Sequence, residues 1–258
     1  MFIEAAFFRF CEGILKSPFG RFDWTEQQIR GLFAQSIVDE LSSRLIQYPS
    51  LRVHMEKKYP ISRDVMKSLP ADVHANFAGK DLTTHLHNYG FNPHNWIEIK
   101  YFSSKSERKY SIPRTENMAS IVKDILRLII LTGAKRGIEN RYLIVVFDSE
   151  PRKYLAMKNT KYGRRKWLEM ILDNRLAEKE LDINFSLEPK SFLNKIGSSK
   201  KIGALSLKLY SQTFLPKIDE RYFDEKKMNA DRLLVYCYLF RIDDFNISFD
   251  NKTMSRFS

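Results

Sequence analysis

The chain has 258 residues, of which 43% are hydrophobic and 13% aromatic, a composition that excludes an intrinsically disordered protein. Lys and Arg outnumber Asp and Glu by 43 to 31, and the net charge of +12 favours a polyanionic partner such as nucleic acid. Only Cys11 and Cys237 are present, which excludes a disulfide framework and a zinc–thiolate site and indicates a reducing compartment.

No segment has the features of a membrane protein. The N-terminus carries an early acid, Glu4, and lacks the basic start and small-residue cleavage site of a secretory signal. The longest apolar runs, at residues 125–131 and 233–240, are well short of the ~20 residues that a membrane helix needs. We therefore expect a soluble, cytoplasmic protein with no membrane partner.

The first predicted element is a helix. Asp23 or Thr25 can cap it, and apolar residues then recur at helical spacing until the chain reaches Pro49. A short strand is expected at residues 51–59. Residues 72–102 are β-rich and irregular, with turns and loops between short strand-like pieces.

A helix and a buried strand follow. Residues 115–131 carry an apolar stripe at helical spacing, with Thr115 as the cap. Residues 141–148 form an apolar, β-branched run that is typical of a fully buried strand. Because strand, helix and strand follow in this order, the strands at 96–102 and 141–148 should be parallel in one mixed sheet. A further helix is expected at residues 166–176.

The last third contains three strand-like pieces, at residues 183–187, 203–209 and 233–242. No Gly/Pro-rich linker separates this region from the rest. We therefore expect a single α/β domain, residues 1–258. Its mixed β-sheet core, flanked by helices, spans about residues 25–180, and a β-containing C-terminal elaboration, about 181–258, packs on the same sheet.

The most informative stretch is Trp96-Ile97-Glu98-Ile99-Lys100-Tyr101-Phe102. With the period of two of a strand, Glu98 and Lys100 point to one face, while Ile97 and Ile99 point to the other. The alternative is a solvated Glu–Lys pair. A strand that packs on one face and carries an acid and an amine on the other is, however, an arrangement that few purely structural strands need.

Metal-assisted phosphodiester hydrolysis requires this combination of groups. Mg²⁺ prefers oxygen ligands such as carboxylates, and a cation can position water or stabilise the negative charge that develops on phosphorus. Glu98 and Lys100 supply one of each. A second carboxylate should precede them, and Asp81, just after Gly79-Lys80, is the first candidate, with Asp72 as the second.

These residues resemble the motif of the PD-(D/E)XK nuclease superfamily, in which an acid at a turn precedes an acid-x-lysine strand. The resemblance covers about residues 25–150 and implies a restriction-endonuclease-like sheet, with Asp81 and Glu98 as Mg²⁺ ligands and Lys100 assisting the attacking water. Lys80 departs from the proline that the family often has before the acid, and Pro70-Ala71-Asp72 is the rival. The family also often has an acid on the first core helix, where Glu40 or Asp39 matches.

The leading hypothesis is therefore a Mg²⁺-dependent endonuclease that acts on DNA, in restriction or another form of defence, with Mn²⁺ able to substitute. Asp81, Glu98 and Lys100 would be catalytic, and a homodimer would match the two-fold symmetry of duplex DNA. The alternative is a non-catalytic, basic nucleic-acid-binding or assembly module on the same fold. Motifs of nucleotide-binding loops and of serine hydrolases are absent from the sequence.

Overall fold

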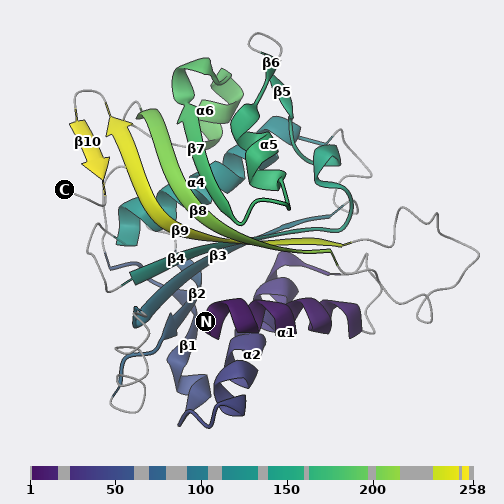
Figure 1. Cartoon of the computed structure of the whole chain (residues 1–258), viewed down its shortest axis with the longest axis vertical. Helices are drawn as coiled ribbons and strands as arrows, with labels where there is room; N and C mark the ends of the chain where they lie inside the picture. The colour runs from purple at the N-terminus through teal and green to yellow at the C-terminus, as the bar shows by residue number, and fades with distance from the viewer. Residues whose placement is uncertain are drawn as a thin grey trace, which may run out of the picture.

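The computed structural model describes residues 2–16, 24–60, 70–79, 92–103, 112–132, 139–159, 163–196, 202–215, 235–249 and 252–255. Within these ranges the protein is a mixed α/β structure in which helices cover both faces of one open, mixed sheet (Figure 1).

The elements agree broadly with the sequence analysis. The helices are α1 (Phe2–Lys16), α2 (Glu26–Ser43), α4 (Arg114–Thr132), α5 (Lys166–Leu172) and α6 (Lys190–Ile196), with 3-10 turns η1 (Pro49–Arg52), η2 (Pro151–Lys153) and η3 (Phe185–Leu187). The strands of the large sheet are β1 (Val53–Lys57), β2 (Ala71–Asn76), β3 (His94–Phe102), β4 (Glu139–Phe147), β7 (Glu178–Asn184), β8 (Ile202–Phe214), β9 (Tyr236–Phe249) and β10 (Lys252–Ser255). A separate small ribbon pairs β5 (Lys158–Asn159) with β6 (Gly163–Arg164).

The strand order is β1-β2-β3-β4-β9-β8-β7, and β10 pairs with β9 outside this path. Among the described strands, β3 and β4 are the one parallel pair, and α4 makes the crossover between them, as the sequence predicts. Lys100 is opposite Val145 in this pair. Strand β9 pairs antiparallel with β4, so the C-terminal strands extend the same sheet as expected. The division into one domain stays a prediction.

Two hydrophobic cores lie on the two faces of the sheet. Helices α1 and α2 pack on one face, and α4, α5 and α6 lie on the other (Figure 1). In β3, Ile97 and Ile99 belong to the core under α1 and α2, whereas Trp96 and Phe102 belong to the core under α4. The alternation of a strand therefore directs Glu98 and Lys100 towards α4.

The two cysteines, distant in sequence, belong to the core between α1, α2 and the sheet. Cys11 of α1 and Cys237 of β9 are both buried and both are free thiols. Burial, together with the neighbouring Cys237 thiol, raises the pKa of Cys11. Both cysteines therefore serve as small apolar residues.

Some predicted boundaries are wrong. The strand expected at residues 183–187 begins at Glu178 and ends at Asn184, whose side chain accepts a hydrogen bond from the Ser186 N–H (3.0 Å) and turns the chain into η3. The strands expected at 203–209 and 233–242 are the longer β8 and β9, and the helix expected at 166–176 ends at Leu172. Helices α1 and α6 were not anticipated.

In the described part of the chain, no helix is both long enough and apolar enough to cross a membrane.

Lys179 of β7 is a buried cation on the face of the sheet that α4, α5 and α6 cover. Its side chain is 1% exposed, and its ammonium donates to two carbonyls at the end of α5, those of Ile171 (2.9 Å) and Asp173 (2.6 Å). Burial lowers its pKa to about 8 from 10.5, against the opposing charge of Asp173.

This shift predicts a pH-dependent stability. Between pH 8 and 10.5 the unfolded chain binds more protons at Lys179 than the folded chain, so the free energy of unfolding should rise with pH, by about 1–3 kcal/mol in total. Lys179→Met should lack this rise, while Lys208→Met, at a 63% exposed lysine, should keep it. Urea denaturation across this range tests the prediction, and parallel pH profiles for wild type and Lys179→Met would contradict it.

Candidate active site

Asp72 lies beside Glu98-Ile99-Lys100, near the end of the pairing between β2 and β3. Val73 of β2 is opposite Ile97 of β3 in this antiparallel pair. Two residues further along β3, the Ile99 N–H donates to the Asp72 carboxylate, with 2.7 Å between N and Oδ2. The side chain of Asp72 thus satisfies a backbone donor of the strand and places a carboxylate at the centre of the motif.

Glu98 is fully buried, and its carboxylate is engaged on both oxygens. Arg127 of α4 lies 3.2 Å from each oxygen through its two terminal nitrogens, and the Tyr59 hydroxyl donates to Oε1. Burial, with the carboxylates of Asp124 and Asp72, raises the pKa of Glu98 well above its usual range, against the effect of Arg127. Arg127 is the cation that opposes this shift at the Glu98 carboxylate.

Lys100 remains accessible, since 20% of its side chain is exposed. Its ammonium lies 3.2 Å from Asp124 Oδ2 and 3.9 Å from Glu26 Oε1. Burial disfavours the charged form, but the carboxylates of Asp124, Glu26 and Asp72 outweigh this and raise the pKa of Lys100. Lys100 is thus a permanent cation at neutral pH, and it is better suited to stabilising negative charge than to accepting a proton.

The N-terminus of α2 completes the cluster. Thr25 and Gln28 form a reciprocal capping box that fixes the start of the helix at Glu26. One turn later, Arg30 pairs with Glu26 and with the Asp72 carboxylate, where Nη2 and Oδ1 are 3.0 Å apart. The positive end of the helix dipole therefore lies among carboxylates.

Among the described residues, the cluster contains four carboxylates, those of Glu26, Asp72, Glu98 and Asp124, and three cations, Arg30, Lys100 and Arg127. It is negative within a chain of net charge +12. Within the described ranges, no three His, Cys, Asp or Glu side chains converge closely enough to hold a metal ion. Asp124 Oδ2 is buried, and the Lys100 ammonium is its ion-pair partner at 3.2 Å.

The structure brings together two of the three residues that the sequence singled out first, Glu98 and Lys100, with the second-ranked acid, Asp72. Asp81, the first-ranked acid, lies outside the described residues, so its role stays a prediction.

Glu40 does not belong to this cluster. Its carboxylate accepts from Arg9 of α1 (2.7 Å) and from Arg44 (2.6 Å), and although burial opposes it, these hydrogen bonds lower the pKa of Glu40. Along α2, Glu40 is about 21 Å from Glu26, the residue that does reach the site. Asp39, the other candidate, is exposed and accepts from Gln35 (2.8 Å).

The sequence analysis missed the residues that surround the motif: Glu26, Arg30, Tyr59, Asp124 and Arg127. A signal existed for two of them. Asp124 and Arg127 interrupt the apolar stripe of α4, three residues apart, and both are buried. Opposite charges on the buried face of a helix require partners, and those partners are Glu98 and Lys100.

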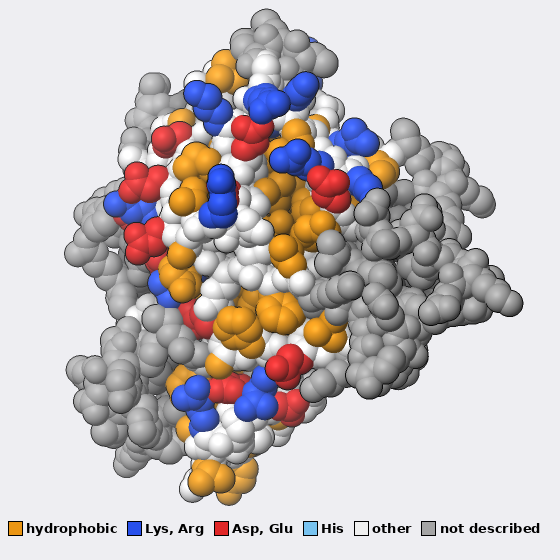
Figure 2. Space-filling view, turned by 45° about the vertical axis from the view of Figure 1, so that its right-hand side comes forward, with side chains coloured by type: hydrophobic (Ala, Val, Ile, Leu, Met, Phe, Trp, Pro, Cys, Tyr) orange, Lys and Arg blue, Asp and Glu red, His pale blue; other side chains and the backbone are white. Residues whose placement is uncertain are grey.

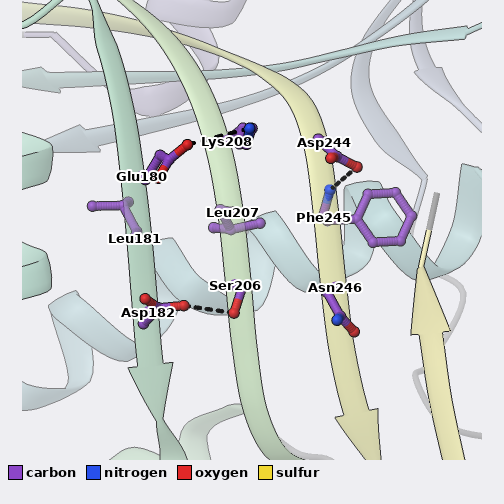
Figure 3. A pocket seen from close by; sticks show the side chains of 9 residues that line it. All are labelled: Glu180, Leu181, Asp182, Ser206, Leu207, Lys208, Asp244, Phe245 and Asn246. Carbon is purple, nitrogen blue, oxygen red and sulfur yellow. Dashed lines mark hydrogen bonds and ion pairs between the residues drawn. The ribbon is translucent and has the colours of Figure 1, made fainter. Parts of the chain in front are cut away.

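A different group of acids lines a hollow of about 340 Å³ on β7, β8 and β9 (Figure 3). Glu180 pairs with Lys208 at 3.2 Å, and Asp182 accepts from Ser206. The Glu180 and Lys208 side chains are 75% and 63% exposed, so this is a solvated ion pair with no buried carboxylate cluster. We therefore place the candidate active site at Glu98 and not here.

Comparisons with protein-family models, with curated proteins and with solved structures gave no significant match. The functional argument therefore depends on the residues and geometry of this chain.

The position of Glu40 predicts a structural role. Glu40→Ala should lower the free energy of unfolding by about 1–3 kcal/mol, because it removes the hydrogen bond from Arg9 that connects α1 to α2 and the one from Arg44 at the end of α2. Asp39→Ala, next to it but exposed, should change stability by less than about 0.5 kcal/mol. Chemical denaturation measures both. Loss of divalent-ion binding in Glu40→Ala, with stability unchanged, would instead return Glu40 to the site.

Proposed function

We propose that this protein is a Mg²⁺-dependent endonuclease of the PD-(D/E)XK type that cleaves DNA with Asp72, Glu98 and Lys100. The observation that carries the proposal is the hydrogen bond from the Ile99 N–H to Asp72, which joins a carboxylate of one strand to the middle of the acid-x-lysine segment of the next. A purely structural hairpin has no need for a buried acid at this point.

The order of the elements supports the same proposal. Helix α2, strands β1, β2 and β3, helix α4 and strand β4 follow one another, and the four strands are neighbours in this order with the last two parallel. This is the succession of helix, hairpin, strand, helix and strand that the resemblance implies.

The donor groups suit Mg²⁺. Asp72 and Glu98 are carboxylates on neighbouring strands, and among the described residues the cluster has one more carboxylate than cations. Asp124, whose Oδ2 is paired with Lys100, adds a further carboxylate beside them. Asp72 and Glu98 would hold the ion, and Mn²⁺ can substitute. When bound, the ion would act as a Lewis acid on the phosphate and its attacking water.

The remaining residues would act on charge and position. Lys100, kept protonated by Asp124, Glu26 and Asp72, would stabilise the negative charge that develops on the phosphate. Asp124 would fix the direction of the Lys100 side chain through their 3.2 Å ion pair. Arg30 would hold Asp72 in place from α2.

A hollow on the same face of the sheet offers exposed arginines to a polyanionic substrate. Three arginines and three acids line it. Val145 is opposite both Lys100 and Tyr238, so Tyr238 is two strands from Lys100, or about 10 Å. Tyr238 lines a hollow of about 610 Å³, together with Arg152 and Arg164. These arginines are 74% and 70% exposed and make only long ion pairs of 3.8 and 3.6 Å, which leaves them available to phosphates. Figure 2 shows Lys and Arg side chains gathered beside an apolar patch in the upper half of the molecule.

A second candidate function has its own support. Because both Glu98 oxygens are engaged by Arg127 and Tyr59, the same cluster would also suit a basic nucleic-acid-binding or assembly module without catalysis. The proposal includes DNA as the substrate, a role in restriction or defence, and a homodimer.

Nicking of supercoiled plasmid separates the two functions. The wild-type protein should nick DNA with Mg²⁺ or Mn²⁺ and not with EDTA. Asp72→Asn, Glu98→Gln and Lys100→Met should each lose about 10²-fold or more in rate, since each removes a charge at the reacting phosphate. Asp81→Asn should retain activity.

Glu180→Gln and Lys208→Met provide matched controls, because they remove an exposed acid–lysine pair from the far strands of the sheet. They should cleave at the wild-type rate. Undiminished cleavage by Glu98→Gln or Lys100→Met would exclude this site, and loss of cleavage in Asp81→Asn with retention in Asp72→Asn would make Asp81 the first acid. No nicking by the wild type with either metal would favour the non-catalytic module.

A further inference from the structure

Glu98 is held more tightly than a metal ligand needs to be. Arg127 Nη1 lies 3.2 Å from Oε2, while Arg127 Nη2, also at 3.2 Å, and the Tyr59 hydroxyl both reach Oε1. The Glu98 side chain has no contact with solvent. A divalent ion that approached either oxygen would come close to the guanidinium charge, which repels it.

Arg127 has further partners that do not depend on Glu98. Its Nη2 donates to the Pro70 carbonyl at 2.8 Å, and its Nη1 donates to Asp124 Oδ1 at 3.2 Å. If Glu98 moved away, the guanidinium would retain a carbonyl and a carboxylate. The contact between Glu98 and Arg127 can therefore open without leaving a buried, unpaired cation.

Tyr59 is fixed independently as well. Its ring stacks on Trp96, with 5.2 Å between centroids, and the Arg127 guanidinium lies 5.8 Å from the Tyr59 centroid. These contacts hold the Tyr59 hydroxyl against Glu98. Removal of the hydroxyl alone would leave the ring packing in place.

We infer that Tyr59 and Arg127 form a latch that holds Glu98 away from the metal, so that a divalent ion binds in competition with the Glu98–Arg127 ion pair. The inference rests on the proposed function, because it assigns Glu98 as a ligand. Tyr59 and Arg127 are positioning residues in this scheme. They determine the concentration of divalent ion at which the site becomes occupied. Because Arg127 lies on α4, binding of the ion is thereby coupled to that helix.

The structure contains a matched control for this latch. Glu4 of α1 is also a buried acid. Its Oε1 accepts from the Tyr142 hydroxyl at 3.4 Å and from Arg241 Nη1 at 3.1 Å. Tyr142 belongs to the core between α1, α2 and the sheet. This group repeats the combination of glutamate, tyrosine and arginine with no lysine of an acid-x-lysine strand beside it. Changes at Tyr142 report the cost of altering such a triad where no metal is proposed.

The test measures Mn²⁺ binding to the full chain without DNA, by calorimetry and by electron paramagnetic resonance. Tyr59→Phe should lower the dissociation constant about three- to tenfold, the effect of one hydrogen bond, because the latched state loses that bond. Arg127→Lys, which keeps a cation but cannot contact both oxygens, should also bind Mn²⁺ more tightly. Tyr142→Phe should bind as the wild type does.

The metal-free melting temperature of each variant separates a change of fold from a change of affinity. An unchanged or weaker affinity in Tyr59→Phe, while Glu98→Gln abolishes binding, would overturn the latch and leave the proposed function standing. Absence of Mn²⁺ binding at millimolar concentration in the wild type and in Tyr59→Phe and Arg127→Lys would overturn both.

Discussion

The candidate site depends on one hydrogen bond, from the backbone of Ile99 to the carboxylate of Asp72. It satisfies the Ile99 N–H beyond Val73 and Ile97, the last residue pair between β2 and β3 on this side. It also brings Asp72 of β2 close to Glu98 and Lys100 of β3. The same carboxylate receives Arg30 from α2, so the bond also connects the helix on one face of the sheet to the strands. Asp72 therefore both supports the fold and belongs to the candidate site. Burial raises its pKa.

Charge compensation explains the rest of the cluster. Three buried carboxylates, those of Asp72, Glu98 and Asp124, require cations close to them. Arg30, Lys100 and Arg127 supply this charge from three different elements. The triad of Glu4, Tyr142 and Arg241 shows that a buried glutamate with these two partners is, by itself, only a structural solution. What distinguishes Glu98 is the presence of Asp72, Asp124 and Lys100 around it.

The sequence could predict what depends on local periodicity. Alternation placed Glu98 and Lys100 on one face of β3, and the buried run at residues 141–148 correctly indicated a parallel neighbour. Asp72 ranks second in the sequence because it lies 26 positions before Glu98, which leaves a long excursion between the two acids. Strand pairing takes place in space, however, and the register between β2 and β3 does not depend on how many residues separate the two strands in the sequence. Helix α1 was missed although Ile3, Phe7, Phe10 and Ile14 recur at helical spacing and all are buried.

The acid on α2 illustrates what local sequence cannot decide. Glu26 and Glu40 lie on the same helix, and both have basic partners within four residues, Arg30 and Arg44. Only the docking of the helix determines that its first turn, and not its last, faces Lys100. That orientation directs the positive end of the helix dipole, together with Arg30, at a group of carboxylates. The negative charge of these carboxylates is partly compensated, while Lys100 stays accessible. A dication has to compete with this compensation, and the excess of carboxylates over cations is the physical reason for expecting that it can.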